Sequence, residues 1–219
     1  MLPAAASPLA PWPGSGTAQV RGVLPAVLYL EHDAGVLALE TARGVGLPIA
    51  WRLGAPALDW GVAVGDVVAL HADGLELPGG RVRRVRGWRP ARVRRSARQV
   101  GGLAGAIASA AERVGEGPGL TPEADDELCG LLLVAHASGL AVDTTGWRGR
   151  TTALSAALLR AAATGHAVAP VVRVADAWLA GRPASPRDLA EVERLGATSG
   201  RALLRGLSAG IGTRELVHG

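Results

Sequence analysis

A glycine-rich stretch followed by two adjacent carboxylates, at residues 115–126, contains the residue types in this sequence most suited to chemistry. Its glycines let the backbone approach a ligand closely, and Thr121-Pro122 is typical of a helix start. The free N–H groups and positive dipole end of a helix start attract anions. Asp125 and Asp126 could hold a metal ion or a substrate amine. The pattern is equally typical of a loop and a capped helix whose first-turn acids complement the dipole.

Two later segments begin in the same style. Thr151 and Thr152 open one helical stretch, with Ser155 one turn further on, and Thr198-Ser199 opens another. Each alone is an ordinary helix cap. Three hydroxyl-bearing starts in one small helical domain predict a shared anion pocket, with one of the two aspartates at its wall.

The elements that must position these starts follow from a change of sequence period near residue 91. Between residues 20 and 93, short apolar runs alternate with turn signals such as Asp73-Gly74 and Gly79-Gly80, a pattern typical of short strands. Such strands predict a small antiparallel β-barrel or sandwich. Beyond it the apolar spacing becomes helical. The predicted fold class is therefore α+β, with a flexible leader at residues 1–18, a β-rich domain at 19–93 and a helical domain at 94–219.

Helical spacing extends over most of the second half. Residues 93–114 have apolar side chains at helical intervals, and further helices are expected at residues 122–138, 152–164, 170–180 and 186–210. Gly196 is expected to interrupt the last of these, and Ser185-Pro186 to cap its start. The single cysteine, Cys129, falls in an apolar helical stretch and is predicted to be a buried structural thiol.

Charge and hydropathy limit the class of protein. The chain has no lysine, which excludes a Schiff-base or P-loop lysine, and residues 81–98 contain nine arginines and no acid. Such a patch can attract nucleic acid, but a solvated face is favoured, because only Trp88 is at hand to stack on bases. No apolar run approaches the roughly 18 residues of a membrane span. The Ala/Pro-rich start lacks the pattern of a signal peptide, so a cytoplasmic protein is expected.

The run Gly-Pro-Gly-Leu-Thr-Pro-x-x-Asp-Asp at residues 117–126 resembles the signature of the AllH-like family. That family includes a subunit of bacterial oxamate carbamoyltransferase, and many of its members have been catalogued as a domain of unknown function. The similarity continues through Thr-Thr-Ala-Leu-Ser at residues 151–155 and Thr-Ser-Gly at 198–200. It extends over roughly residues 100–210, and the β-rich half is also of the kind that this family carries.

The chain departs from the family pattern at three places. Glu123-Ala124 stands where members usually have Ser-Gly, and Glu127 stands where an aromatic residue often follows the aspartate pair. Ala197 replaces a histidine that commonly precedes Thr-Ser-Gly. If that histidine acts in catalysis, this chain has a divergent activity.

The resemblance implies a subunit of a multi-subunit carbamoyltransferase of allantoin or purine breakdown. Such an enzyme exchanges a carbamoyl group between oxalurate and phosphate, giving oxamate and carbamoyl phosphate, so it implies small anionic substrates and partner protein subunits. Asp125 or Asp126 would be catalytic and would orient the carbamoyl amine or a Mg²⁺ ion. The residues implied in binding the anion are Gly117, Gly119, Thr121, Thr151, Thr152, Ser155, Thr198, Ser199 and Gly200. The alternative is a non-catalytic anion-binding or scaffold subunit whose partner chains do the chemistry.

Overall fold

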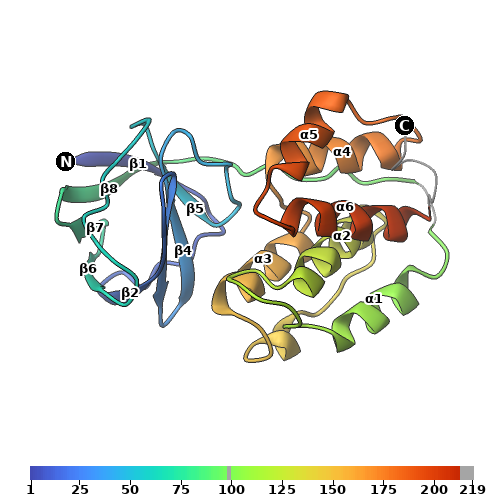
Figure 1. Cartoon of the computed structure of the whole chain (residues 1–219), viewed down its shortest axis with the longest axis horizontal. Helices are drawn as coiled ribbons and strands as arrows, with labels where there is room; N and C mark the ends of the chain where they lie inside the picture. Colours follow the sequence, from blue (N-terminus) through green and yellow to red (C-terminus); the bar gives the residue numbers. More distant parts are fainter. Residues whose placement is uncertain (98–99, 213–219) are drawn as a thin grey trace. The chain divides into compact units, whose positions relative to one another are not determined.

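The computed structural model describes residues 1–97 and 100–212, and the chain divides into two compact units, Met1–Pro90 and Ala91–Gly219. The first unit is built of strands and the second of helices (Figure 1), so the α+β class is confirmed. The dividing point lies three residues before the predicted boundary after residue 93.

The first unit is a closed barrel in which the strands follow the order β1-β5-β4-β3-β2-β6-β7-β8. Its interior is filled by aliphatic side chains and by Trp51 and Trp60. The strands are β1 (Leu2–Ala6), β2 (Gly16–Leu24), β3 (Val27–His32), β4 (Gly35–Glu40), β5 (Ala50–Leu53), β6 (Val67–His71), β7 (Gly74–Leu77) and β8 (Gly80–Gly87).

The barrel is mixed, which corrects the prediction of an antiparallel one. β4 pairs with β5 in parallel, and the connection at residues 41–49 carries the chain back to the same end of the sheet. β1 pairs in parallel with β8 and closes the barrel. The other neighbouring strands are antiparallel, including the hairpin of β3 and β4.

The prediction of a flexible leader at residues 1–18 is wrong. Residues 2–6 form β1, whose three alanines are buried in the barrel. Trp12 packs on Trp51 with ring centroids 4.3 Å apart, and its Nε1 donates a hydrogen bond to the carbonyl of Ala72 at 3.2 Å. The small side chains of this stretch, which are also typical of a disordered segment, fit where a closed barrel leaves little room.

The helical unit is organised around α2 (Glu123–Ala137), most of whose residues are buried. α2 packs against α1 (Leu103–Glu112), α3 (Ala153–Ala163) and α6 (Ser199–Ile211), and α4 (Ala169–Leu179) packs against α5 (Pro186–Glu193) and α6. A short 3₁₀ helix spans Thr145–Trp147. The buried free thiol of Cys129 lies on α2, as predicted.

α2 and α6 cross with their backbones in close contact. A Cβ atom on Gly206 would lie 1.9 Å from the carbonyl oxygen of Glu127, and one on Gly130 would lie 2.4 Å from that of Leu203. Only glycine fits at these two positions, so the crossing brings the start of α6 beside the start of α2.

The predicted helix at residues 93–114 begins only at Leu103, and residues 93–97 instead run extended over the ends of two helices. The N–H of Val93 donates to the carbonyl of Gly165, and that of Ser96 to the carbonyl of Ala137, each at 2.9 Å. Arg95 adds a hydrogen bond to the carbonyl of His136. Because these backbone N–H groups donate to carbonyls at the ends of α3 and α2, they cannot form the hydrogen bonds of a helix at residues 93–97.

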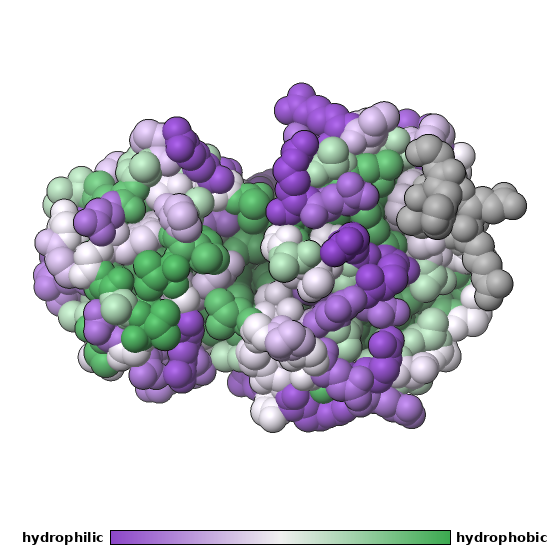
Figure 2. Space-filling model, in the orientation of Figure 1, coloured by the Kyte–Doolittle hydropathy of each residue, from purple (hydrophilic) through white to green (hydrophobic). Residues whose placement is uncertain are grey.

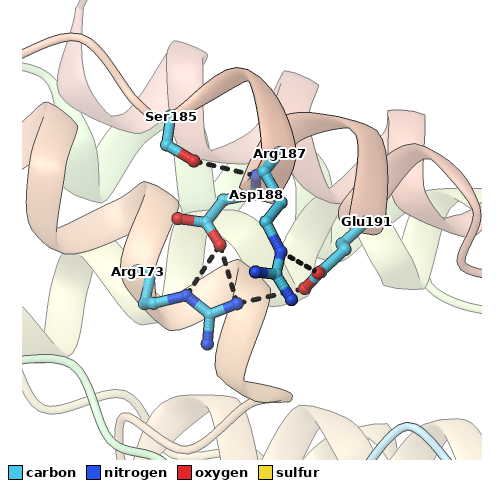
Figure 3. A network of polar contacts seen from close by, with 5 residues as sticks. All are labelled: Arg173, Ser185, Arg187, Asp188 and Glu191. Atoms are coloured by element: carbon cyan, nitrogen blue, oxygen red, sulfur yellow. Dashed lines mark hydrogen bonds and ion pairs between the residues drawn. The ribbon is translucent and has the colours of Figure 1, made fainter.

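The last predicted helix is divided as expected, into α5 and α6 on either side of Gly196. The Ser185 hydroxyl accepts the N–H of Asp188 at 3.1 Å and caps α5 (Figure 3). Arg173 of α4 donates to Asp188 at 2.7 Å and to Glu191 at 3.1 Å. This network ties the short α5 to α4.

Candidate functional site

The start of α2 holds the two aspartates singled out from the sequence. Its N-cap residue is Pro122, with no side-chain cap, so the prediction that Thr121 caps this helix is wrong. The Thr121 hydroxyl instead lies 3.2 Å from the Ser199 hydroxyl, at the start of α6. The Thr121 hydroxyl contacts α6 because the packing of α2 against α6 places the Ser199 hydroxyl next to it.

Asp125 is fully buried and saturated with hydrogen bonds. Its Oδ1 accepts the N–H of Gly115 at 2.8 Å, and its Oδ2 accepts the Ser155 hydroxyl at 2.6 Å. The Thr151 hydroxyl donates to the same Oδ2. Asp125 therefore fastens the glycine loop and the start of α3 to α2.

Gly115 meets this carboxylate in a backbone conformation that only glycine tolerates. Its φ is +90°, and a Cβ atom would lie 2.0 Å from the carbonyl oxygen of Arg150. Gly117, with φ +119°, is under similar constraint, since its Cβ would lie 2.9 Å from the Glu123 nitrogen. The loop is thus held against α2 by shape as well as by hydrogen bonds.

Asp126, the next residue, has different surroundings. It is 5% exposed and accepts hydrogen bonds from the Ser199 and Thr121 side chains. Its Oδ2 is buried and has no hydrogen-bond partner in the part of the chain that the structure describes. An acceptor left unpaired in a buried place is costly, which makes it a candidate for contact with a ligand donor.

Burial raises the pKa of Asp126 to about 6. The hydrogen bonds from Ser199 and Thr121 act in the opposite direction, and the nearby charges of Asp125 and Glu123 raise the pKa further. The carboxylate is therefore poised to change its protonation state near neutral pH.

The predicted helix starts do come together, and they converge on the two carboxylates. Thr121 and Ser199 surround Asp126, while Thr151 and Ser155 surround Asp125. Thr152 caps α3 by accepting the N–H of Ser155 at 3.0 Å, as expected of a helix start. Its hydroxyl also donates to the carbonyl of Leu120 at 2.6 Å, which links α3 to the glycine loop.

Other predicted residues lie at the edge of this cluster or serve the fold. Gly117 and Gly119 are in the exposed loop, and Thr198 is exposed and makes no side-chain cap. Gly200 is buried, its N–H donates to the carbonyl of Leu195 at 2.9 Å, and a Cβ atom would lie 1.9 Å from the carbonyl of Val192. Its N–H is thus engaged within the fold, so the anion-binding role expected of Gly200 would require that bond to break.

The cluster has two members that the sequence did not single out. Gly115 supplies a backbone donor to Asp125, and Arg205 of α6 pairs with Glu123 at the start of α2. Gly115 belongs to the glycine run and could have been found there. Arg205 lies 82 positions from its partner, and no local pattern signals such a pairing.

Of the two aspartates expected to hold Mg²⁺, Asp125 has no free oxygen for the ion, because both of its oxygens accept hydrogen bonds. Mg²⁺ needs free oxygen ligands in octahedral geometry. Among the described residues, no three His, Cys, Asp or Glu side chains gather closely enough to hold a metal ion.

Comparison with known proteins identifies one family. Residues 113–211 match the model of the family described as oxamate carbamoyltransferase subunit AllH, which confirms the resemblance found in the sequence. The match covers the starts of α2, α3 and α6, and the barrel lies outside it. No curated protein and no solved structure matches the chain. None of the described helices is long and apolar enough to cross a membrane.

Proposed function

We propose, from the match of residues 113–211 to the AllH family, that the chain is a subunit of an oxamate carbamoyltransferase-like enzyme that works with partner subunits. Its own contribution is a binding site for the carbamoyl-bearing substrate. The observation that carries this proposal is Asp126, a buried carboxylate with one unpartnered oxygen between the starts of α2 and α6.

The reaction supplies a group that fits this carboxylate. In the family's reaction, a phosphate oxygen attacks the carbamoyl carbon of oxalurate. The C–N bond breaks, a C–O bond forms, and the proton of the phosphate passes to the nitrogen of the departing oxamate. The carbamoyl group keeps an NH₂ throughout, and an ionised carboxylate is an acceptor that can hold it. Asp126 would bind and orient this NH₂.

Backbone N–H groups of the exposed loop at Gly117 and Gly119 suit the oxygens of the same substrate. The Thr121 and Ser199 hydroxyls are half-buried at the site and already engaged with each other and with Asp126. One helix start stabilises an anion by only about 0.3–1 kcal/mol at an exposed position. Phosphate binding here therefore depends on the starts of α2 and α6 acting together with the loop, and on shelter from partner subunits.

Asp125 has a positioning role in this proposal. Its contacts go to Gly115, Thr151 and Ser155, and both oxygens are engaged in them. It fixes the loop and the start of α3 so that Asp126 and its hydroxyls stay in place, as expected of a group that supports a binding residue.

A second candidate function is a non-catalytic scaffold subunit. Two features favour it: Ala197 stands where the family commonly has a histidine, and the hydroxyls of Thr151 and Ser155 are already occupied by Asp125. In that case the cluster would serve to pack the helices, and partner chains would bind the substrate.

Asp126→Asn separates the two functions. The change keeps the shape of the side chain but gives the buried site an NH₂ of its own, which opposes the substrate's NH₂. We expect binding of oxamate and carbamoyl phosphate, measured by calorimetry, to weaken about tenfold or more, the loss of one charge-assisted hydrogen bond. Turnover by the enzyme assembled with its partner subunits should fall with it.

Glu127→Gln is the matched control, since Glu127 is the next residue on α2 and pairs with Arg113, at 3.4 Å, away from the cluster. It should bind the same ligands as the unchanged chain does. If Asp126→Asn leaves both binding and turnover unaltered, the scaffold function is correct.

A further inference from the structure

The last strand of the barrel, β8, loses its in-and-out alternation halfway along. Val82 is buried, but every residue from Arg83 to Gly87 is exposed. The pairing with β1 shifts at this point, from Ala4 opposite Arg84 to Ala5 opposite Arg86, so that Val85 is the extra residue of a β-bulge. Bulges re-aim side chains, and here Arg84, Val85 and Arg86 all reach the surface.

The arginines of β8 fall into two groups according to their partners. Arg81 and Arg83 share one carboxylate, that of Asp73, each at 2.8 Å. Arg84 and Arg86, and Arg89 just beyond the strand, have no acidic partner among the described residues. Before the bulge one carboxylate offsets part of the positive charge, and after the bulge no described carboxylate pairs with those three arginines.

The uncompensated arginines line one cleft of about 720 Å³ on the barrel, together with Val85 and Trp88. This volume is in the range of sites for small ligands, about 300–1,000 Å³. Val85 is 56% exposed there and adds an apolar side chain to the cleft.

Trp88 gives the cleft a fixed aromatic wall. Its backbone N–H donates to the carbonyl of Ala6, and its Nε1 to the carbonyl of Ala50, both at 3.0 Å. The Arg52 guanidinium lies over the ring, 5.4 Å from the ring centroid. A ring held by its own hydrogen bond and a cation–π contact, on a backbone that is also hydrogen-bonded, is already in place before a ligand arrives, which lowers the entropic cost of binding.

We propose that this cleft binds a small polyanion of the polyphosphate class, either an inorganic polyphosphate or a nucleoside polyphosphate. Arg84 and Arg86 stand on either side of the bulge at Val85 and line the same cleft, so their guanidinium groups can take neighbouring phosphates of one chain. Guanidinium forks bind phosphate oxygens in pairs of parallel hydrogen bonds. Arg89 adds a third charge, and Val85 and Trp88 offer an apolar seat to a base.

A single-stranded nucleic acid suits this surface less well. Extended strands are held by several stacking rings along a basic groove. The cleft has one such ring, Trp88. The arginines also act over a short part of one strand, which matches a compact ligand better than a long one.

The test compares two double variants of the full chain that remove the same charge from the same strand. Arg84→Gln with Arg86→Gln alters the cleft, and Arg81→Gln with Arg83→Gln alters the arginines that Asp73 compensates. Tripolyphosphate and ATP are the probes, titrated by calorimetry and followed by tryptophan fluorescence. We expect the first pair to weaken binding about tenfold or more, and the second less than about threefold.

Comparing the affinities of the probes distinguishes the possible ligands. Tighter binding of ATP than of tripolyphosphate, with a fluorescence change that disappears in Trp88→Phe, supports a nucleoside polyphosphate. Equal binding of the two supports an inorganic polyphosphate. Equal weakening by both double variants, no binding of either probe, or a single-stranded oligonucleotide binding more tightly than ATP would each overturn the proposal.

Discussion

Asp125 and Asp126 are neighbours on one helix turn, yet their surroundings give them opposite roles. Both carboxylate oxygens of Asp125 accept hydrogen bonds, from the glycine loop and from α3. Asp126 keeps a buried oxygen without a partner and has its pKa raised to about 6 by burial. The first carboxylate therefore holds the structure, and the second is available for a ligand at a cost in stability.

That cost gives a prediction for Asp126→Asn in the absence of ligand. The folded-state pKa is above the usual value of 3.8, so the folded chain holds this proton more tightly than the unfolded chain does. Stability from this residue is fully present below about pH 4 and is lost as pH rises through 6. A difference of about two pKa units corresponds to roughly 3 kcal/mol.

We therefore expect Asp126→Asn to be more stable than the unchanged chain at pH 7.5, and the advantage to vanish near pH 4. Urea unfolding at both pH values measures it. The comparison must be between variants, because His136 and His166 have pKa values lowered mainly by burial, and their contribution falls as pH decreases below about 6.5. An equal difference in stability at both pH values would contradict the argument.

At the scale of elements, the crossing of α2 and α6 decides where the site forms. Gly206 and Gly130 allow the two backbones to meet, and this contact places Ser199 beside Thr121 and Asp126. The site is therefore as sensitive to the packing of helices as to its own polar residues.

Gly206→Ala should separate these helices. The new methyl group would lie 1.9 Å from the carbonyl oxygen of Glu127, so the backbone must move. We expect a loss of at least about 2 kcal/mol in the free energy of unfolding, the usual scale for overpacking, together with weaker binding of oxamate at Asp126.

Gly105→Ala in α1 is the matched control. That glycine is exposed inside a helix, and a Cβ atom there meets nothing within 4 Å. The change should raise stability by about 1 kcal/mol through helix propensity alone. Chemical denaturation measures both variants, and equal effects would mean that the crossing is looser than described.

The helix starts could be predicted because their signals are local. The hydroxyl and proline at Ser185-Pro186 and the hydroxyl of Thr152 act within one turn, and both caps form as expected. The different roles of Asp125 and Asp126 depend on which side chains of α3 and α6 contact them, and the sequence near the aspartates does not reveal those contacts. Thr121 was mistaken for a cap for the same reason, since its partner Ser199 lies 78 positions away.

The extended strap at residues 91–97 was missed because its apolar spacing is compatible with a helix. This segment is instead hydrogen-bonded to carbonyls at the ends of α2 and α3. Arg95 donates to the carbonyl of His136, 41 positions later in the chain, and Arg92 to that of Thr164, 72 positions later. Arginines near helix ends complement the negative end of the dipole. The described arginines of residues 81–98 are all exposed, as predicted, while Arg98 lies outside the described residues.

At the scale of the whole molecule, each unit contains its own core. All eight strands and the aliphatic core of the barrel lie within residues 1–90, and the helices and both aspartates lie beyond it. Figure 2 shows larger hydrophobic areas on the visible face of the barrel than on that of the helical unit. Most of the large exposed hydrophobic residues indeed belong to the barrel, namely Met1, Leu24, Val45, Val64, Val67 and Val85.

We expect residues 1–90 and 91–219, produced separately, each to fold. Circular dichroism should show strand in the first and helix in the second, and each should unfold cooperatively on heating. Residues 1–60 are the control, because they lack β6, β7 and β8 and leave the barrel open. Failure of the 91–219 piece to fold, while the full chain folds, would show that the helical unit depends on the barrel.

The strand that closes the barrel has a consequence during synthesis on the ribosome. Leu2 of β1 pairs with Val82 of β8, 80 positions later in the chain. At about 5–20 residues per second, β1 waits roughly 4–16 s for that partner to be made. During this interval the backbone donors and acceptors on the edge of β1 that faces β8 are open to wrong pairing, as at any unpaired strand edge, while the other edge pairs with β5. A strand of small side chains, Leu-Pro-Ala-Ala-Ala, offers a nascent neighbour little apolar surface and a proline that cannot donate. The alanines that make β1 resemble a disordered segment in the sequence thus also reduce its tendency to pair wrongly until β8 has been synthesised.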